Sequence, residues 1–146
     1  MTDLPMHPEP PSSPPDPGLV VLGRFQPVHR GHALMIAAAE EWRLLNTPEL
    51  RLIIAIGSSN RPESIGNPWS AEEREAMLGA WLADKDGFED VLIVAIPDID
   101  DPPNWVAHAE KYHGSAGIFF TSDLPSADLY ETGGWQVVRI PLEQRE

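Results

Sequence analysis

Short apolar runs alternate along the chain with segments of helical spacing. Continuous stretches rich in valine and isoleucine are typical of strands that are buried on both faces of a parallel sheet. Such runs predict five strands, over Gly18–Gly23, Leu50–Ile56, Val91–Ile96, Gly117–Thr121 and Gln136–Ile140. The segments between them predict four helices, over Ala33–Leu45, Ser70–Leu82, Asn104–Tyr112 and Leu124–Thr132.

This strict alternation of strand and helix predicts the fold class. It indicates an α/β protein, a Rossmann-like, doubly wound parallel five-stranded sheet with helices on both faces and right-handed crossovers. In such sheets ligands bind beyond the carboxyl ends of the strands, where the strand order reverses. Residues that directly follow each predicted strand are therefore the candidates for a functional site.

The beginning of the chain differs in composition from the rest. Residues 1–17 contain seven of the 16 prolines. Because proline removes a backbone donor and disfavours helix in its neighbours, this segment is expected to be a disordered, proline-rich tail. Residues 18–146 are then expected to form one domain.

Charge and composition exclude several classes of function. The chain has 23 acidic and 10 basic residues, a formal net charge of −13, which argues against a general binder of nucleic acid or anionic membranes. It has no cysteine, which excludes thiol catalysis, disulfides and cysteine-bound zinc. No apolar run approaches the roughly 20 residues of a membrane span, and no secretory signal is recognisable. The expected location is therefore the cytoplasm.

The most informative stretch follows the first predicted strand and reads GRFQPVHRGH, residues 23–32. It places Arg24, His29, Arg30 and His32 around Gly31 at the start of a helix. The helix dipole favours an anion there, and a glycine lets a phosphate approach the backbone. The stretch matches neither GxGxxG nor the P-loop, yet it predicts a polyphosphate ligand.

These histidines allow two other interpretations. His29 and His32 could be ligands of a metal ion, but His7, His108 and His113 are the only other imidazoles, and no carboxylate stands at the spacing of a zinc motif. They could also be ordinary surface residues, which their spacing and the preceding GRFQP make less favourable.

GRFQPVHRGH resembles the signature of the HxGH-motif nucleotidyltransferase superfamily, and more narrowly that of the archaeal-type nicotinamide-nucleotide (NMN) adenylyltransferases. Further blocks resemble that family in the same order along the chain. They are IGSS at 56–59, NPWSAEER at 67–74, IPDI at 96–99 with Trp105 after it, TSDL at 121–124 and PLEQR at 141–145.

The resemblance implies adenylyl transfer from ATP to nicotinamide mononucleotide, which gives NAD and pyrophosphate, in NAD biosynthesis. It implies Mg²⁺ carried mainly by ATP and no metal site of the protein's own. It further implies a homo-oligomer, and the acidic composition given above predicts no nucleic-acid or membrane partner. Arg24, His29 and His32 match positions that are catalytic in the family. Those for ATP binding are Gly23, Arg24, Phe25, Gln26, His29, His32, Ser122 and Asp123, and those for NMN binding are Asn67, Arg74, Asp98 and Trp105.

Two of these residues have simpler alternatives. Arg74 could form an ion pair with a neighbouring glutamate, and Asp98 could be an acid that caps a loop. Among the other aromatic residues, Trp42 and Trp81 are expected in the core, and Trp135 in the core or an interface.

The chain departs from the family pattern in three places. Residues 62–64 read PES, so an acid replaces a histidine of the family, and residues 122–125 read SDLP where the family has SGNP. The chain also ends at Glu146 without the family's ISGTxIR-type motif, which supplies phosphate contacts. A fragment, compensation by a neighbouring subunit and decayed catalysis remain open.

Because of these departures, two other functions are also compatible with the sequence. One is an adenylyl or cytidylyl transferase for another phosphorylated acceptor, and the other is a truncated nucleotide-binding module without turnover. Trp105 and the NPWSAEER block favour a nicotinamide nucleotide over pantetheine phosphate as the acceptor.

Overall fold

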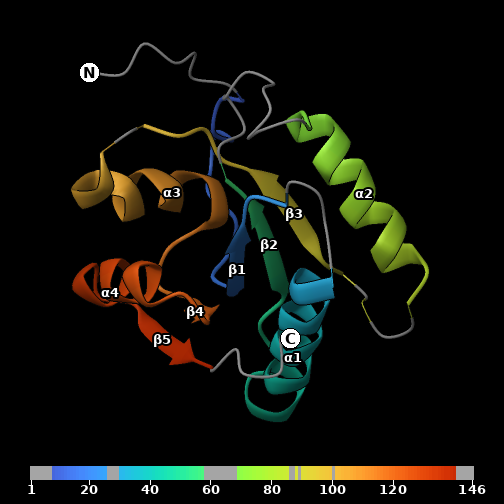
Figure 1. The fold of residues 1–146 in the computed structure, drawn as a ribbon. Coiled ribbons are helices and arrows are strands. Elements are labelled where there is room, and N and C mark those ends of the chain that lie inside the picture. The colour runs from blue at the N-terminus through green and yellow to red at the C-terminus, as the bar shows by residue number, and fades with distance from the viewer. Residues whose placement is uncertain are drawn as a thin grey trace.

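Five parallel strands form one sheet at the centre of the molecule, in the order β3-β2-β1-β4-β5 (Figure 1). The computed structural model describes residues 8–25, 30–57, 69–85, 88, 90–99 and 101–140. The strands are β1 (Leu19–Gly23), β2 (Leu52–Ile56), β3 (Leu92–Ala95), β4 (Ile118–Thr121) and β5 (Gln136–Arg139). The prediction of an open parallel sheet is confirmed.

Four α-helices cover the two faces of this sheet. They are α1 (Arg30–Asn46), α2 (Ala71–Ala83), α3 (Trp105–His113) and α4 (Leu124–Thr132), and a short 3-10 helix, η1 (Pro102–Asn104), leads into α3. Figure 1 shows α1 and α2 on one face and α3 and α4 on the other. No helix in the described part of the chain is both long and apolar enough to cross a membrane.

The helix after β1 begins three residues earlier than the sequence pattern predicts. Arg30, Gly31 and His32 belong to the first turn of α1, whereas the apolar periodicity alone starts at Ala33. The helix α2 begins with a capping box, in which Ser70 Oγ accepts from the Glu73 amide at 3.0 Å and the Ser70 amide donates to the Glu73 carboxylate at 2.8 Å.

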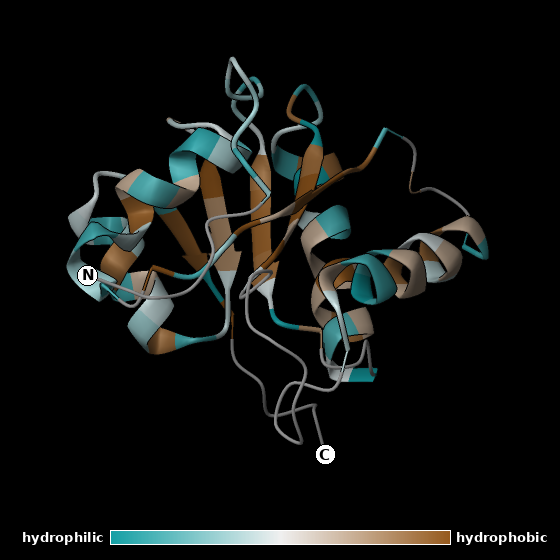
Figure 2. Ribbon diagram, turned by 90° about the horizontal axis from the view of Figure 1, so that it is seen from above, coloured by the Kyte–Doolittle hydropathy of each residue, from teal (hydrophilic) through white to brown (hydrophobic). Residues whose placement is uncertain are grey.

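The pairing register makes the central strands end together. Leu19 pairs with Leu52 at the start of β1 and β2, and Gly23 pairs with Ile56 at their ends. All five residues of β2 are buried, as expected for a strand with helices on both faces, and Figure 2 shows the apolar strands between more polar helix surfaces. The loops after β1 and β2 therefore leave the sheet side by side.

Each face of the sheet has its own apolar core. Val21, Ile54 and Phe120 point toward α1 and α2, with Ile36 and Leu78 packed against them. The other core, beneath α3 and α4, gathers Val20, Ile53, Phe119, Tyr130 and Trp135. Trp42 and Trp81 are half-buried against the first core, as predicted, and Trp135 lies in the second.

A buried histidine lies in the second core. His113 Nδ1 lies 2.8 Å from the Gly114 carbonyl, which can only accept, so Nδ1 carries the proton. Nε2 then accepts from the Tyr130 hydroxyl at 2.8 Å. Burial lowers the pKa of His113 and raises that of Tyr130, so both side chains are neutral around pH 7.

The described part of the proline-rich segment, residues 8–17, contains neither helix nor strand and is mostly exposed. Two of its backbone carbonyls lie against the domain. The Tyr112 hydroxyl donates to the Pro8 carbonyl at 2.9 Å. At Gly114, where φ is 89°, a Cβ atom would meet the Pro15 carbonyl at 2.5 Å, so only glycine fits. Disorder of residues 1–17 stays a prediction.

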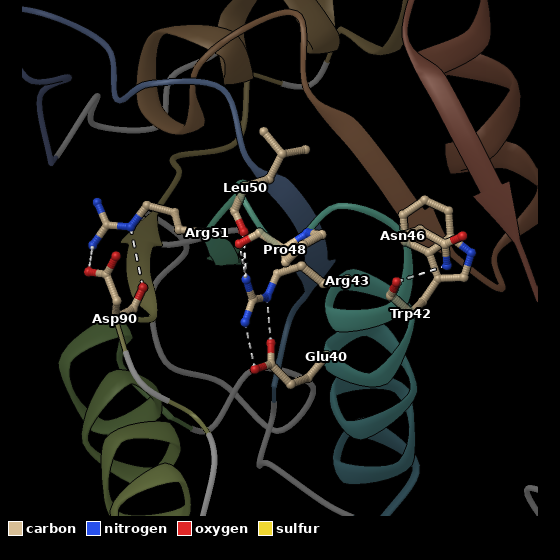
Figure 3. A network of polar contacts seen from close by, with 8 residues as sticks. All are labelled: Glu40, Trp42, Arg43, Asn46, Pro48, Leu50, Arg51 and Asp90. Carbon is tan, nitrogen blue, oxygen red and sulfur yellow. Dashed lines mark hydrogen bonds and ion pairs between the residues drawn. The ribbon is translucent and has the colours of Figure 1, made fainter.

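Arg43, near the end of α1, ties this helix to the segment that leads into β2 (Figure 3). Its Nε and Nη2 donate to the two carboxylate oxygens of Glu40 at 2.7 and 2.9 Å, and Nη1 donates to the Leu50 carbonyl at 2.7 Å. Glu40 is only 6% exposed. The nearby Arg51–Asp90 pair, at 3.0 Å, is much more exposed.

We predict that Arg43→Met lowers the free energy of unfolding by about 3 kcal/mol, because it leaves the buried Glu40 carboxylate without its cation. Arg51→Met is the matched control and should lower it by less than about 1 kcal/mol. Urea denaturation measures both. Equal losses in the two variants would contradict the assignment of Arg43–Glu40 as the structurally important pair.

Candidate functional site

A cavity of about 630 Å³ opens at the carboxyl ends of the strands. The strands β2 and β3 lie on one side of β1, and β4 and β5 lie on the other. The cavity lies where the strand order reverses in this way. This is the switch point at which the sequence pattern predicts a ligand site. Its lining residues are Leu22, Gly23, Arg24, Gly57, Asp98, Asp101, Pro102, Trp105, Thr121, Asp123, Ser126 and Leu129.

The turn after β1 depends on a buried phenylalanine in an unusual conformation. Phe25 has φ of 53°, a left-handed value that is uncommon for a side chain of this size, and it is 1% exposed. Its ring lies so close to Gly23 that a Cβ atom there would be 3.0 Å away. Phe25 therefore acts as an anchor inside the core, while Arg24, exposed beside it, lines the cavity.

His32 packs on this anchor from the first turn of α1. Its ring centroid is 4.5 Å from that of Phe25, at an interplanar angle of 50°. The first turn of α1 contains no acidic residue. The positive end of the helix dipole thus lies next to an imidazole, with no carboxylate in that turn to neutralise it, which favours an anion.

Arg74 on α2 forms hydrogen bonds to the backbone of the loops that follow β1 and β2. Its Nη1 donates to the carbonyl of Arg24 at 2.9 Å and to that of Gly57 at 2.8 Å, and its Nε donates to the Ser70 carbonyl at 3.2 Å. The side chain is fully buried. Burial, and then the positive charge of Arg24, lower the pKa of Arg74. The structure thus places this guanidinium on the backbone of the site, outside the cavity lining.

Two acidic residues and an aromatic one also line the cavity. Asp98 follows β3, Asp101 precedes η1, and Trp105 opens α3, so all three come from one connection between strand and helix. The Asp101 carboxylate accepts from the Asn104 side-chain amide at 2.7 Å. The sequence pattern indicated Asp98 and Trp105 but not Asp101, because its position in an acidic run concealed its place at the cavity.

Asp123 occupies the start of α4. Its carboxylate accepts from the Ser126 amide at 3.0 Å and from the Ser126 hydroxyl at 2.6 Å, and its own amide donates to Thr121 Oγ1 at 3.0 Å. The carboxylate neutralises the dipole of α4, so this edge does not attract phosphate as α1 does. Ser122 is half-buried next to it and is not among the lining residues.

Thr121, Ser126 and Leu129 line the cavity but were not selected from the sequence. The rule that ligands bind after the strands would have identified Thr121, the last residue of β4. Ser126 and Leu129 lie within α4, and only the packing of that helix brings them to the cavity. Gln26, His29 and Asn67 lie outside the described residues, as do residues 62–64 and 141–146.

The described residues contain no cluster of three or more histidines or carboxylates that could hold a metal ion. The carboxylates of Asp98 and Asp101 nevertheless line the cavity, and their oxygens are of the kind that hard divalent cations bind.

Comparison with known proteins places this geometry in context. The cytidylyltransferase-like family model matches residues 20–121. A nicotinamide-nucleotide adenylyltransferase from Ignicoccus hospitalis is 32% identical over 125 residues, which cover 85% of this chain and 70% of that protein. The nicotinamide-nucleotide adenylyltransferase from Pyrococcus horikoshii is 32% identical over 129 residues, and the match spans 88% of this chain and 66% of that protein.

A solved structure agrees with the same family. It is the bifunctional NMN adenylyltransferase/ADP ribose pyrophosphatase of Francisella tularensis complexed with AMP and a manganese ion. The two structures superpose with a TM-score of 0.63 at 25% identity, and the match covers 84% of this chain and 36% of that one. The chain thus spans about two thirds of its curated relatives and about a third of this neighbour.

We predict that Arg74→Lys destabilises the protein by about 2–3 kcal/mol, because an ammonium group on a shorter side chain leaves buried carbonyls unsatisfied. The Gly57 amide, which donates to the Gly23 carbonyl at 2.8 Å, should also exchange its hydrogen faster. Thermal unfolding and hydrogen exchange measure the two effects. Unchanged exchange at Gly57 would contradict the role of Arg74 in joining the loops.

Proposed function

This chain belongs to the cytidylyltransferase-like family and, within it, to the nicotinamide-nucleotide adenylyltransferases, and from that premise we propose that it transfers the adenylyl group of ATP to nicotinamide mononucleotide. The products are NAD and pyrophosphate. The observation that supports this best is the lining of one cavity by Arg24, which follows β1, together with Trp105 and Asp98 from the connection after β3.

The reaction requires no protein nucleophile. An oxygen of the NMN phosphate attacks the α-phosphorus of ATP, a new P–O bond forms, and the bond to the β-phosphate breaks as pyrophosphate leaves. The enzyme must align two anions that repel each other and stabilise the charge that grows on the leaving group. ATP enters as its magnesium complex, so that the divalent ion belongs to the substrate.

We assign the phosphate side to the start of α1. Arg24, which lines the cavity, supplies a guanidinium. His32, which packs on Phe25 and is not among the lining residues, supplies an imidazole, and α1 supplies its dipole. Gly23, Phe25, Gln26 and His29 complete the assigned ATP-binding and catalytic set, in which Arg24, His29 and His32 stabilise the charge on the leaving pyrophosphate.

We assign the nicotinamide nucleotide to a second set of residues. The pyridinium ring carries a positive charge, which an indole face attracts, so Trp105 is its proposed partner. Asp98 adds a negative charge to the same region, and Asn67 completes the assigned set. Arg74 contributes as a positioning residue, since it holds the backbone of Arg24 and of Gly57.

The remaining assignments concern the residues that follow the carboxyl end of β4. Ser122 and Asp123 are proposed to border the adenosine, where a carboxylate engaged as a helix cap can still accept from ribose hydroxyls. We further propose a cytoplasmic enzyme that acts as a homo-oligomer.

We predict that the protein, given magnesium, ATP and nicotinamide mononucleotide, produces NAD and pyrophosphate in equal amounts. His32→Ala should lower kcat about 100-fold or more, because a donor to the developing charge is lost. Chromatography of the nucleotides and a coupled pyrophosphate assay measure both products. Pyrophosphate formed only with a different phosphorylated acceptor would refute the proposed substrate, and full turnover of the variant would refute the assigned site.

We predict that Trp105→Ala raises the KM for nicotinamide mononucleotide about 2- to 30-fold, the factor expected from loss of a cation–π contact. The KM for ATP should stay within twofold of the parent value. Trp105→Phe, which keeps an aromatic face, should lie between the two. Steady-state kinetics with each substrate varied in turn decides this, and a larger effect on ATP than on the acceptor would contradict the assignment.

A further inference from the structure

Three ring side chains form a ladder along one side of α3. Trp105, His108 and Tyr112 are spaced by three and four residues, so they lie on the same face of the helix. The ring centroid of His108 is 5.6 Å from that of Trp105 and 5.3 Å from that of Tyr112, tilted by 55° and 59°. His108 thus stands directly behind the indole that lines the cavity.

His108 also holds the loop that carries Asp98. Its Nε2 lies 2.7 Å from the Pro97 carbonyl oxygen. A backbone carbonyl only accepts, so Nε2 carries a hydrogen and donates it. Pro97 directly precedes Asp98, which lines the cavity. One half-buried side chain therefore contacts both the Trp105 ring and the loop of Asp98, without belonging to the cavity lining itself.

The far end of the ladder is held as well. Tyr112 is 3% exposed, and its hydroxyl donates to the Pro8 carbonyl at 2.9 Å. The histidine ring is therefore confined between an indole and a tyrosine that is itself anchored. Because the His108 ring is fixed, it restricts the rotamers of the neighbouring Trp105 ring. Trp105 then loses less side-chain entropy when a ligand binds.

We propose that His108 is a positioning residue for the nicotinamide nucleotide, which orients the Trp105 ring through ring contact and the Asp98 loop through the Pro97 carbonyl. This inference rests on the proposed function, because it assigns the acceptor to the Trp105 side of the cavity. His108 touches neither the phosphates nor the reacting atoms. Its removal should therefore weaken acceptor binding and leave the chemical step and ATP binding unchanged.

Three substitutions separate the two contacts. His108→Gln keeps a donor for the Pro97 carbonyl and loses the ring, His108→Phe keeps a ring and loses the donor, and His108→Ala loses both. We expect the KM for nicotinamide mononucleotide to rise about tenfold in His108→Ala and less in the other two, with kcat and the KM for ATP within about twofold of the parent. Lys111→Gln, an exposed change on the same helix, is the matched control and should alter none of these constants.

A double-mutant cycle tests whether His108 acts through the indole. In a Trp105→Ala background, His108→Ala should raise the acceptor KM by a smaller factor than in the parent, because the ring it orients is gone. A role in general stability would instead lower the melting temperature and leave the two effects on KM independent. Circular dichroism of every variant records folding alongside the kinetics.

Calorimetric titration with nicotinamide mononucleotide alone distinguishes failure of this inference from failure of the proposed function. Turnover by the parent with no change of acceptor KM in the His108 variants would overturn the inference alone. Acceptor binding that weakens in these variants, in a parent without turnover, would support the inference and overturn the proposed reaction. A parent that neither binds nor converts this nucleotide would overturn both.

Discussion

The site depends on the contact of one buried guanidinium with the backbone of two loops. Arg74 reaches from α2 beneath the sheet edge and donates to the carbonyls of Arg24 and Gly57, which follow the two central strands. The contact with the Gly57 carbonyl is buried, and a buried carbonyl without a partner is costly. The turn that presents Arg24 is thereby held in place by a residue that does not line the cavity itself.

This constraint works together with the strained turn at Phe25. A phenylalanine keeps a left-handed backbone conformation only where its surroundings impose it. Here the Phe25 ring is buried next to Gly23 and against His32. Phe25 thus fixes the backbone directly after β1. As a result, the positive group of Arg24 and the dipole of α1 lie at the same end of the sheet.

The charges around the cavity follow from how the helices begin. The first turn of α1 contains no acid, whereas Asp123 caps α4 and the connection before α3 adds Asp98 and Asp101. An anion is favoured near the first helix, and a cationic ring or a set of hydroxyls near the others. An acidic protein with a net charge of −13 can in this way still offer a local site for phosphates.

The sequence alone determined the sheet, the alternation of elements and the edge at which a ligand would bind, because apolar runs and their spacing are local properties of the chain. It also selected Arg24, His32, Asp98 and Trp105, which follow strands or open helices. Only the tertiary structure decided that Arg74 contacts backbone, that Asp101 lines the cavity and that His108 stands behind Trp105. These relations join residues of different elements, and the direction in which a side chain points depends on helix packing, which no local pattern records.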